Sequence, residues 1–176
     1  MNTEIEVRVL NIDKEDLISK LKKNNAKFIG DWFQVRYVYD FKSIDPNRWI
    51  RLRTNGVETT LTLKEVHDKS VEGTKELEVK VSSIETTHLI LEKLGYKRRS
   101  IQENKRIRYI LNNVEVDIDT WPGLNIYVEF EANSEEQIKE VFKILNLDYK
   151  DAITDNAQDI YMSMGYTHED LNNLKF

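Results

Sequence analysis

The chain has 176 residues, of which 32% are charged and 40% are hydrophobic, and its formal net charge is −5. This length suits one folding unit with a continuous core, so we expect a single domain over residues 1–176. The acidic balance disfavours a long nucleic acid as partner, although a local basic cluster could still hold a compact anion. The absence of cysteine excludes disulfides and thiolate chemistry and makes the cytoplasm the expected compartment. We expect no membrane association, because the sequence shows neither an apolar leader nor a membrane-spanning run.

Alternation of apolar and polar residues with a period of two predicts about eight strands. They cover residues 3–10, 33–42, 47–54, 57–66, 75–82, 103–111, 113–120 and 126–132. Asn55-Gly56 separates two of them and suits a tight type I′ hairpin, and Asn112-Asn113 is expected to play a similar part. The sequence therefore predicts a largely antiparallel sheet.

Apolar residues at helical spacing predict helices over residues 14–24, 85–94, 135–145 and 156–164. Asp13 and Ser134 precede the first and third of these stretches and suit the N-cap position. The acidic residues after Ser134 also favour a helix start, because they complement the helix dipole. We expect an α+β fold, mainly antiparallel β, with the helices packed outside the sheet.

One face of most of the predicted strands is almost entirely ionisable and carries both signs of charge. In the first strand Glu4, Glu6 and Arg8 alternate with Ile5 and Val7. A single strand of this kind is typical of a half-solvated sheet. Eight such strands favour closure, which removes exposed sheet edges and places the charged face in the lumen. Close carboxylates and guanidinium groups in a lumen are costly without ligands, so this lining favours a metal and an anion.

Six segments carry these ionisable residues in a fixed order: EIEVR at 4–8, WIRLR ending at Arg53, TLTLK ending at Lys64, KELEV, NKRIRY, and IDTWPGLNIYVEFE at 118–131. Together they resemble the motifs of the CYTH family, the triphosphate tunnel metalloenzymes, over nearly the whole chain. The resemblance implies an eight-stranded closed β tunnel with helices outside. It also implies a divalent metal, Mg²⁺ or Mn²⁺, held by acidic side chains, and a triphosphate held by basic ones.

The resemblance also assigns roles to single residues. The metal ligands it implies are Glu4, Glu6, Asp119, Glu129 and Glu131, with Asp117 and Glu115 as second choices on the same face. The implied substrate-binding residues are Arg8, Arg51, Arg53, Lys64, Glu76, Glu78, Arg106 and Arg108.

Position 8 departs from the family pattern, which has lysine where this chain has arginine. Arg8 is our candidate catalytic residue, but arginine stays protonated, so we expect it to orient and neutralise phosphate and not to act as a base. Trp32, Trp49 and Trp121 receive no role, because aromatic residues at strand ends usually pack in the core or at its rim.

The leading functional hypothesis is a metal-dependent hydrolase that removes the terminal phosphate of a short triphosphate, with inorganic triphosphate as the first candidate. Charge neutralisation and positioning supply most of the help that this chemistry needs. The motifs leave open an adenylate cyclase that converts ATP to cyclic AMP and pyrophosphate. They also leave open a thiamine triphosphatase, and a non-catalytic polyphosphate- or nucleotide-binding module, which Arg8 makes more credible. The expected partner is a small-molecule triphosphate, and a homodimer stays open.

Overall fold

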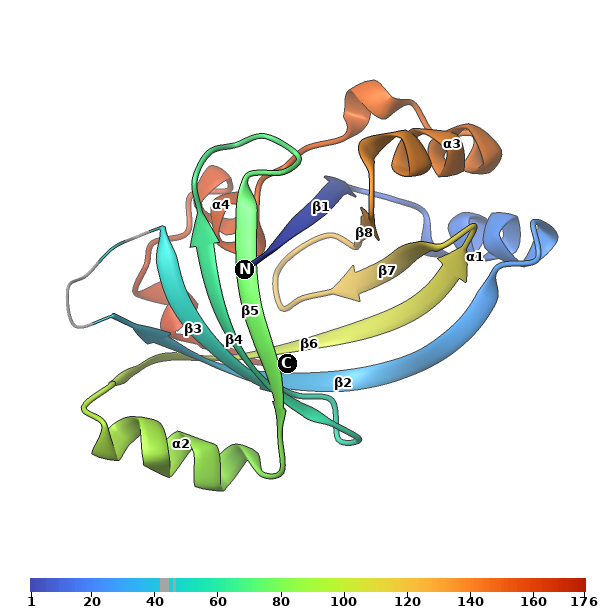
Figure 1. Ribbon diagram of the computed structural model, residues 1–176. Coiled ribbons are helices and arrows are strands. Elements are labelled where there is room, and N and C mark those ends of the chain that lie inside the picture. The colour runs from blue at the N-terminus through green and yellow to red at the C-terminus, as the bar shows by residue number, and fades with distance from the viewer. Residues whose placement is uncertain (42–44, 46) are drawn as a thin grey trace.

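The computed structural model describes residues 1–41, 45 and 47–176. Its centre is a sheet in the order β2-β3-β4-β5-β1-β8-β7-β6, which closes on itself because β2 also pairs with β6 (Figure 1). The strands are β1 (Asn2–Val9), β2 (Lys27–Asp40), β3 (Arg48–Thr54), β4 (Thr59–Val66), β5 (Thr74–Val81), β6 (Arg98–Leu111), β7 (Val114–Thr120), β8 (Tyr127–Ala132) and β9 (Asn173–Leu174). The helices are α1 (Lys14–Lys23), α2 (Ile84–Lys93), α3 (Glu135–Leu145) and α4 (Ala157–Ser163), with two short 3-10 turns, η1 (Tyr149–Asp151) and η2 (Asp170–Asn172).

Within the described ranges this architecture confirms the predicted closed antiparallel barrel of eight strands with four helices outside. The two-residue strand β9 is an addition, and it pairs in parallel with β6. None of the helices in these ranges is long and apolar enough to cross a membrane.

The largest differences from the predicted boundaries concern the two strands that close the barrel. β2 begins at Lys27 and not at residue 33, and β6 begins at Arg98 and not at residue 103. In neither extension do apolar and polar residues alternate cleanly, and the pairing register of β2 with β6 shifts between Phe28 and Gly30. The extensions are strands because β2 and β6 pair with each other over most of their length. Residue 42, the predicted last residue of the second strand, lies outside the described residues.

The two predicted asparagine turns behave differently. Asn112 and Asn113 have φ values of 51° and 64° between the paired residues Leu111 and Val114, which is the predicted type I′ hairpin. The prediction for Asn55-Gly56 is wrong, because the hairpin loop spans residues 55–58 and Asn55 does not have a positive φ. The side chain of Asn55 instead accepts backbone hydrogen bonds from the next turn of the loop.

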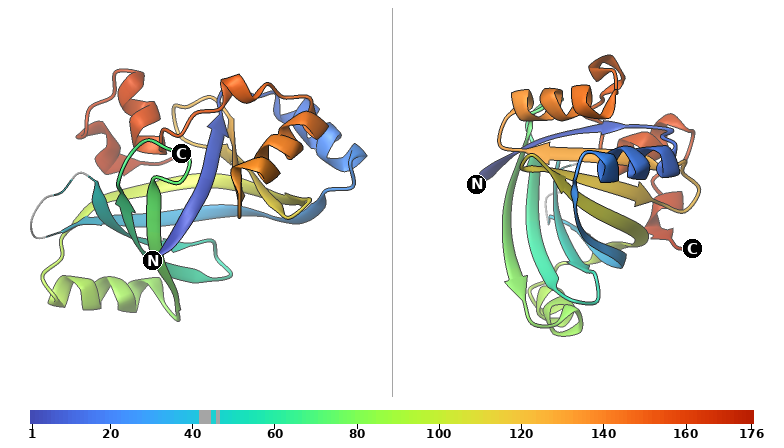
Figure 2. Two further views of the ribbon diagram at one scale, coloured as in Figure 1. Left: turned by 45° about the horizontal axis from the view of Figure 1, so that its top comes forward. Right: turned by 90° about the vertical axis from the view of Figure 1, so that its right-hand side faces the viewer.

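Two sets of helices cover the outside of the barrel. α1 and α3 begin at their predicted N-caps, Asp13 and Ser134, whose side chains accept backbone N–H bonds of the first turn. Their apolar faces pack on the outer face of β1, β6, β7 and β8, where Phe130 and Phe142 lie with ring centroids 4.7 Å apart. α2 covers the outer face of β2, β3 and β4 through Ile84 and Leu91. Figure 2 shows α3 and α2 on opposite sides of the barrel. The outer face of β5 stays open, because Leu77 and Val79 are exposed there.

Candidate functional site

The barrel encloses a cavity of about 530 Å³ lined by side chains from all eight barrel strands and from the C-terminal segment. The residues predicted to bind metal or substrate that line this cavity are Glu4, Glu6, Arg8, Arg51, Arg53, Lys64, Glu76, Glu78, Arg106, Arg108, Glu129 and Glu131, together with the second choice Glu115. Asp119 is fully buried in the wall behind Arg106. Strand alternation thus places the charged faces inward, as the sequence predicts.

Three predicted metal ligands come together at one wall. One carboxylate oxygen each from Glu4, Glu6 and Glu131 lies within 4.8 Å of the others. Glu6 and Glu131 are direct register partners on β1 and β8, and Glu4 precedes Glu6 on the same strand face. Hard divalent cations such as Mg²⁺ prefer oxygen ligands of this type, so the donor set fits such an ion.

The electrostatics of this cluster also fit a cation. Burial and the neighbouring carboxylates Glu129, Glu4 and Glu6 raise the pKa of Glu131 to about 8. No Lys or Arg nitrogen in the described part of the chain lies within 4 Å of the Glu131 carboxylate. Glu4 and Glu6 are paired with Lys64 and Arg8, so Glu131 is the member of the cluster whose charge the described residues leave uncompensated.

Arg8 lies beside this cluster and joins two of its neighbours. Its Nη2 lies 2.6 Å from Glu129 and 2.9 Å from Glu6, and its Nη1 donates to the Asp155 carbonyl at 3.1 Å. Burial alone would lower the pKa of Arg8, but Glu129 and Glu6 outweigh it and raise that pKa well above its usual value. Burial alone would raise the pKa of Glu129, but Arg8 and Arg106 hold it well below its usual range. A direct contact of Arg8 with phosphate stays a prediction, and it would have to compete with these partners.

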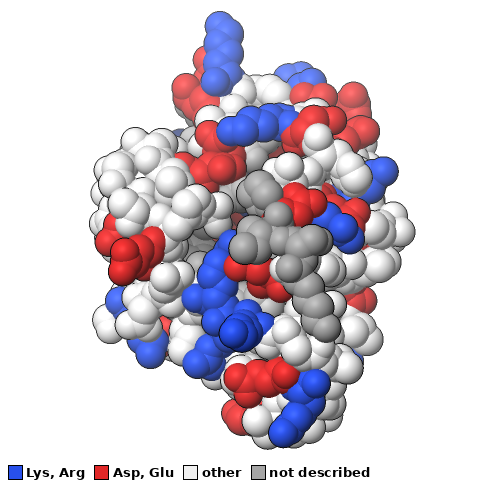
Figure 3. Space-filling view, turned by 90° about the vertical axis from the view of Figure 1, so that its left-hand side faces the viewer, with Lys and Arg blue, Asp and Glu red and all other residues white. Residues whose placement is uncertain are grey.

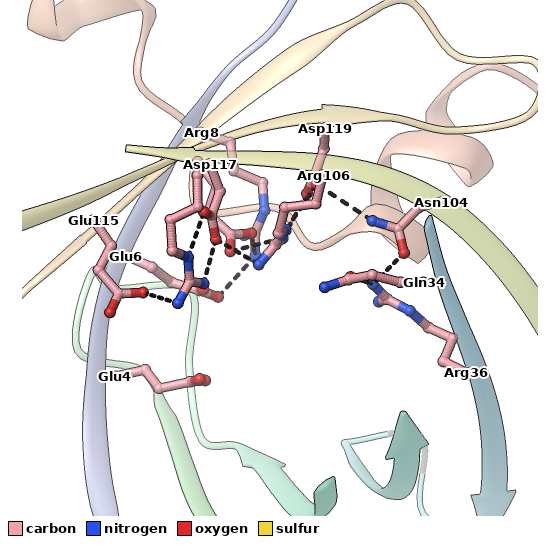
Figure 4. Close-up of polar contacts among 12 residues, drawn as sticks. Glu4, Glu6, Arg8, Gln34, Arg36, Asn104, Arg106, Glu115, Asp117 and Asp119 are labelled. Carbon is pink, nitrogen blue, oxygen red and sulfur yellow. Dashed lines mark hydrogen bonds and ion pairs between the residues drawn. The ribbon is translucent and has the colours of Figure 1, made fainter. Parts of the chain in front are cut away.

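Arg106 is the centre of a second buried network. It contacts Asp117 at 2.6 Å, Asp119 at 2.8 Å and Glu129 at 3.2 Å, and Arg108 also donates two hydrogen bonds to Asp117 (Figure 4). Buried charges of this kind are stable only when they are paired, so this part of the wall largely neutralises itself. The metal role of Asp119 and the phosphate roles of Arg106 and Arg108 stay predictions.

The predicted cations of the middle strands differ in their acidic partners: Lys64 and Arg51 each lie near two carboxylates, whereas Arg53 does not. Lys64 contacts both oxygens of Glu4, at 2.6 and 2.8 Å, and therefore faces the carboxylate cluster. Arg51 lies 3.3 Å from Glu78, which also accepts a hydrogen bond from Thr62. Arg53 has no carboxylate within 4 Å in the described ranges. Arg51 and burial lower the pKa of Arg53 well below its usual value, which reports an excess of positive charge.

Arg36 is a cavity residue that the sequence reasoning missed. It faces the lumen from β2, donates to Asn104 Oδ1 at 2.9 Å, and stacks 4.4 Å from the ring centroid of Trp121. Burial, together with Arg51 and Arg106, lowers the pKa of Arg36 to about 9. Its sequence signal is weak, because Val38 takes the next lumen position on β2 and interrupts the charged face.

The C-terminal segment forms part of the cavity wall. The backbone of Ile153 exchanges two hydrogen bonds with that of Arg8, at 2.8 and 2.9 Å, and α4 places Tyr161 against Trp121.

The face at the left of Figure 1 is hollowed, and Lys and Arg side chains gather beside the hollow (Figure 3). Such a basic rim attracts anions toward the opening.

A closed antiparallel tunnel with an ionisable lumen of both signs defines the structural class of this protein. The CYTH domain matches residues 2–159, and the chain belongs to the CYTH family. CYTH proteins are metal-dependent enzymes that act on triphosphate substrates.

Individual relatives agree with this assignment. A protein of Methanocaldococcus jannaschii with the provisional name of an adenylate cyclase is 29% identical over 158 residues, which are 82% of this chain and 90% of that protein. A solved protein of Pyrococcus horikoshii is 26% identical with a TM-score of 0.74, over 87% of this chain and 96% of that one. A Hippeastrum protein, provisionally named an adenylyl cyclase and described as having a dominant triphosphatase activity, shares the fold at 15% identity, with a TM-score of 0.61 over 93% and 97% of the two chains.

Proposed function

We propose that this protein is a divalent-metal-dependent hydrolase of short triphosphates and that inorganic triphosphate is its substrate. One observation carries the proposal: the cavity combines a carboxylate cluster, in which Glu131 has no cationic partner among the described residues, with guanidinium groups that have no acidic partner there. The carboxylates come from β1 and β8, whereas Arg36 and Arg53 come from β2 and β3. A triphosphate is a compact polyanion that needs a metal and several cations along its length. A lumen with both groups supports such a substrate.

Glu4, Glu6 and Glu131 are the residues that would hold Mg²⁺ or Mn²⁺. A bound divalent ion neutralises charge on phosphate oxygens and polarises the phosphorus for attack. Arg8 and Arg106 position Glu129 beside this cluster, because both guanidinium groups contact its carboxylate.

The remaining contribution of the chain is binding and orientation. Arg51, Arg53 and Lys64 supply donors for the phosphate oxygens, and these charges favour the transition state as negative charge spreads over the transferred group. Water supplies the nucleophile: its oxygen bonds to the terminal phosphorus, the bridging P–O bond breaks, and orthophosphate and pyrophosphate form. One proton of the water stays on the orthophosphate, and the other passes to the departing pyrophosphate or to solvent. The closed wall of the barrel keeps the substrate in line with that attack.

A second candidate is an adenylate cyclase, which the name of the 29% identical relative favours. In this reaction the ribose 3′-hydroxyl attacks the α-phosphate of ATP and pyrophosphate leaves. The cavity lining includes the half-buried Trp49, whose ring offers aromatic surface for a base.

Product analysis separates the two activities. The purified protein is incubated with inorganic triphosphate or ATP under Mg²⁺ or Mn²⁺, and phosphate, pyrophosphate and cyclic AMP are quantified. Orthophosphate release from inorganic triphosphate is the expected result. Cyclic AMP with pyrophosphate would establish the cyclase instead, and tight binding without turnover would contradict both enzymatic proposals.

A further inference from the structure

Arg36 and the carboxylate cluster lie on opposite walls of the tunnel. In the closed ring, three strands separate β1 from β2 on either side: β5, β4 and β3 in one direction, and β8, β7 and β6 in the other. Figure 4 shows Glu4 entering the lumen from β1 and Arg36 entering it from β2 across the open space. A ligand held by the carboxylate-side metal therefore reaches Arg36 only with its far end.

The far wall carries two guanidinium groups without an acidic partner. Arg36 and Arg53 are direct register partners on β2 and β3, and both line the cavity. Like charges placed opposite each other on neighbouring strands destabilise a sheet. No carboxylate among the described residues lies within 4 Å of either side chain, and the buried Nε of Arg36 has no hydrogen-bond acceptor. An anion bound between the two guanidinium groups would supply the missing charge and offset this repulsion.

Neutral groups hold Arg36 in place. Asn104 accepts a hydrogen bond from Nη2 at 2.9 Å, and the ring of Trp121, itself only 3% exposed, supports the guanidinium plane at 4.4 Å. These contacts orient the guanidinium group but leave its charge free. Arg8 and Arg106 differ in this respect, because each of them contacts at least two carboxylates. Arg36 is thus preorganised for an anionic ligand.

We propose that Arg36, together with Arg53, selects inorganic triphosphate over nucleoside triphosphates by seating an unesterified phosphate at the end of the substrate remote from the metal. This inference rests on the proposed function, because it assumes that the scissile end of the substrate lies at the carboxylate wall. An unesterified terminal phosphate has a second pKa of about 6 and carries close to two negative charges at neutral pH. The α-phosphate of ATP carries one. Two unpaired guanidinium groups favour the more highly charged end.

Metal-free binding tests the assignment independently of turnover. Isothermal titration calorimetry in EDTA measures the Kd of inorganic triphosphate and of ATP for the wild type, Arg36→Gln and Arg36→Lys. Arg98→Gln is the matched control, because Arg98 also stacks on an aromatic ring, Tyr37 at 4.7 Å, but is exposed. Loss of one charge-assisted contact weakens binding roughly 10- to 100-fold. We expect Arg36→Gln to lose this much for inorganic triphosphate and clearly less for ATP, Arg36→Lys to recover part of the preference, and Arg98→Gln to keep the wild-type ratio.

An equal loss for both ligands, an unchanged ratio, or a wild type that binds neither ligand would overturn the assignment. If Arg36→Gln does not fold, Arg36→Lys takes its place, because a compact ammonium cannot reproduce the two-oxygen contact of a guanidinium. A weaker preference of Arg36→Lys for inorganic triphosphate over ATP than in the wild type would support the assignment, and an unchanged preference would contradict it. The proposed function fails separately. If the wild type hydrolyses neither compound but Arg36→Gln abolishes the binding preference for inorganic triphosphate, the hydrolase is contradicted and the role of Arg36 in binding is upheld. If the wild type hydrolyses inorganic triphosphate but Arg36→Gln leaves the ratio of the two Kd values unchanged, the hydrolase is upheld and the role of Arg36 is contradicted.

Discussion

Arg8 lies 2.6 Å from Glu129, its direct register partner on β8, and both side chains are buried in the tunnel wall. The same guanidinium group contacts Glu6 at 2.9 Å, so one cation on β1 joins two carboxylates next to the candidate metal cluster. Such a buried arrangement is costly to break, because without Arg8 the described residues leave Glu6 with no cation and Glu129 with Arg106 alone, at 3.2 Å. Position 8 therefore links the stability of the barrel to the geometry of its site.

Replacing Arg8 should test this link. Arg8→Ala leaves Glu129 and Glu6 without their shared cation, and we expect a loss of about 3–5 kcal/mol in the free energy of unfolding. Arg8→Lys should lose less, because it keeps the charge. Urea denaturation measures both. Lys20→Ala, which breaks an ion pair on the exposed face of α1, should change little. A loss for Arg8→Ala no larger than that of this control would contradict the structural role.

The raised pKa of Glu131 predicts an unusual dependence of stability on pH. Its folded-state pKa is about 8, above the usual glutamate value of 4.5. The folded state thus binds the proton more tightly, so the stability from this group is complete below about pH 4.5 and is lost as the pH rises toward 8. In EDTA, Glu131→Gln should flatten this decline and be more stable than the wild type near pH 8. Urea denaturation between pH 5 and 9 checks this, with the exposed Glu140→Gln as control. Parallel curves for wild type and Glu131→Gln would contradict it.

Metal titration should separate the predicted acidic ligands into two groups. Glu4→Gln, Glu6→Gln and Glu131→Gln each remove a member of the carboxylate cluster and should weaken Mn²⁺ binding about tenfold or more. Asp119→Asn should leave the affinity nearly unchanged, because Asp119 lies outside the cluster and is fully buried against Arg106. Electron paramagnetic resonance of free Mn²⁺ gives the Kd values. An equal weakening by Asp119→Asn would place Asp119 in the metal site, as the resemblance implies.

Arg53 should show a conflict between stability and function. Arg51, burial and Arg36 all act to lower its pKa, so its charge destabilises the folded state. Arg53→Met keeps an unbranched side chain and removes this charge. We expect an unchanged or higher melting temperature, and a kcat/KM for inorganic triphosphate lower by roughly 10- to 100-fold. A lower melting temperature with unchanged kinetics would mean that Arg53 is structural.

The sequence by itself determined the strand pattern and the composition of the lumen. Alternation over β1 and over β3 was enough to place Glu4, Glu6, Arg51 and Arg53 on inward faces, because the side-chain period of a strand is fixed by its backbone. The motif that contains Asp119 and Glu129 belongs to the family resemblance, and these residues lie on the neighbouring strands β7 and β8. Helix starts at Asp13 and Ser134 followed from local capping chemistry.

Only the tertiary structure decided which charges neutralise one another. Lys64 meets Glu4 and Arg8 meets Glu129 because barrel closure brings distant strands together, and local alternation contains no information on such distances. The same closure extends β2 and β6 beyond their alternating parts and places Arg36 opposite Arg53. Whether a guanidinium group in the lumen is available to a ligand depends on which carboxylates lie within contact distance, and that is a property of the closed ring and not of any one strand.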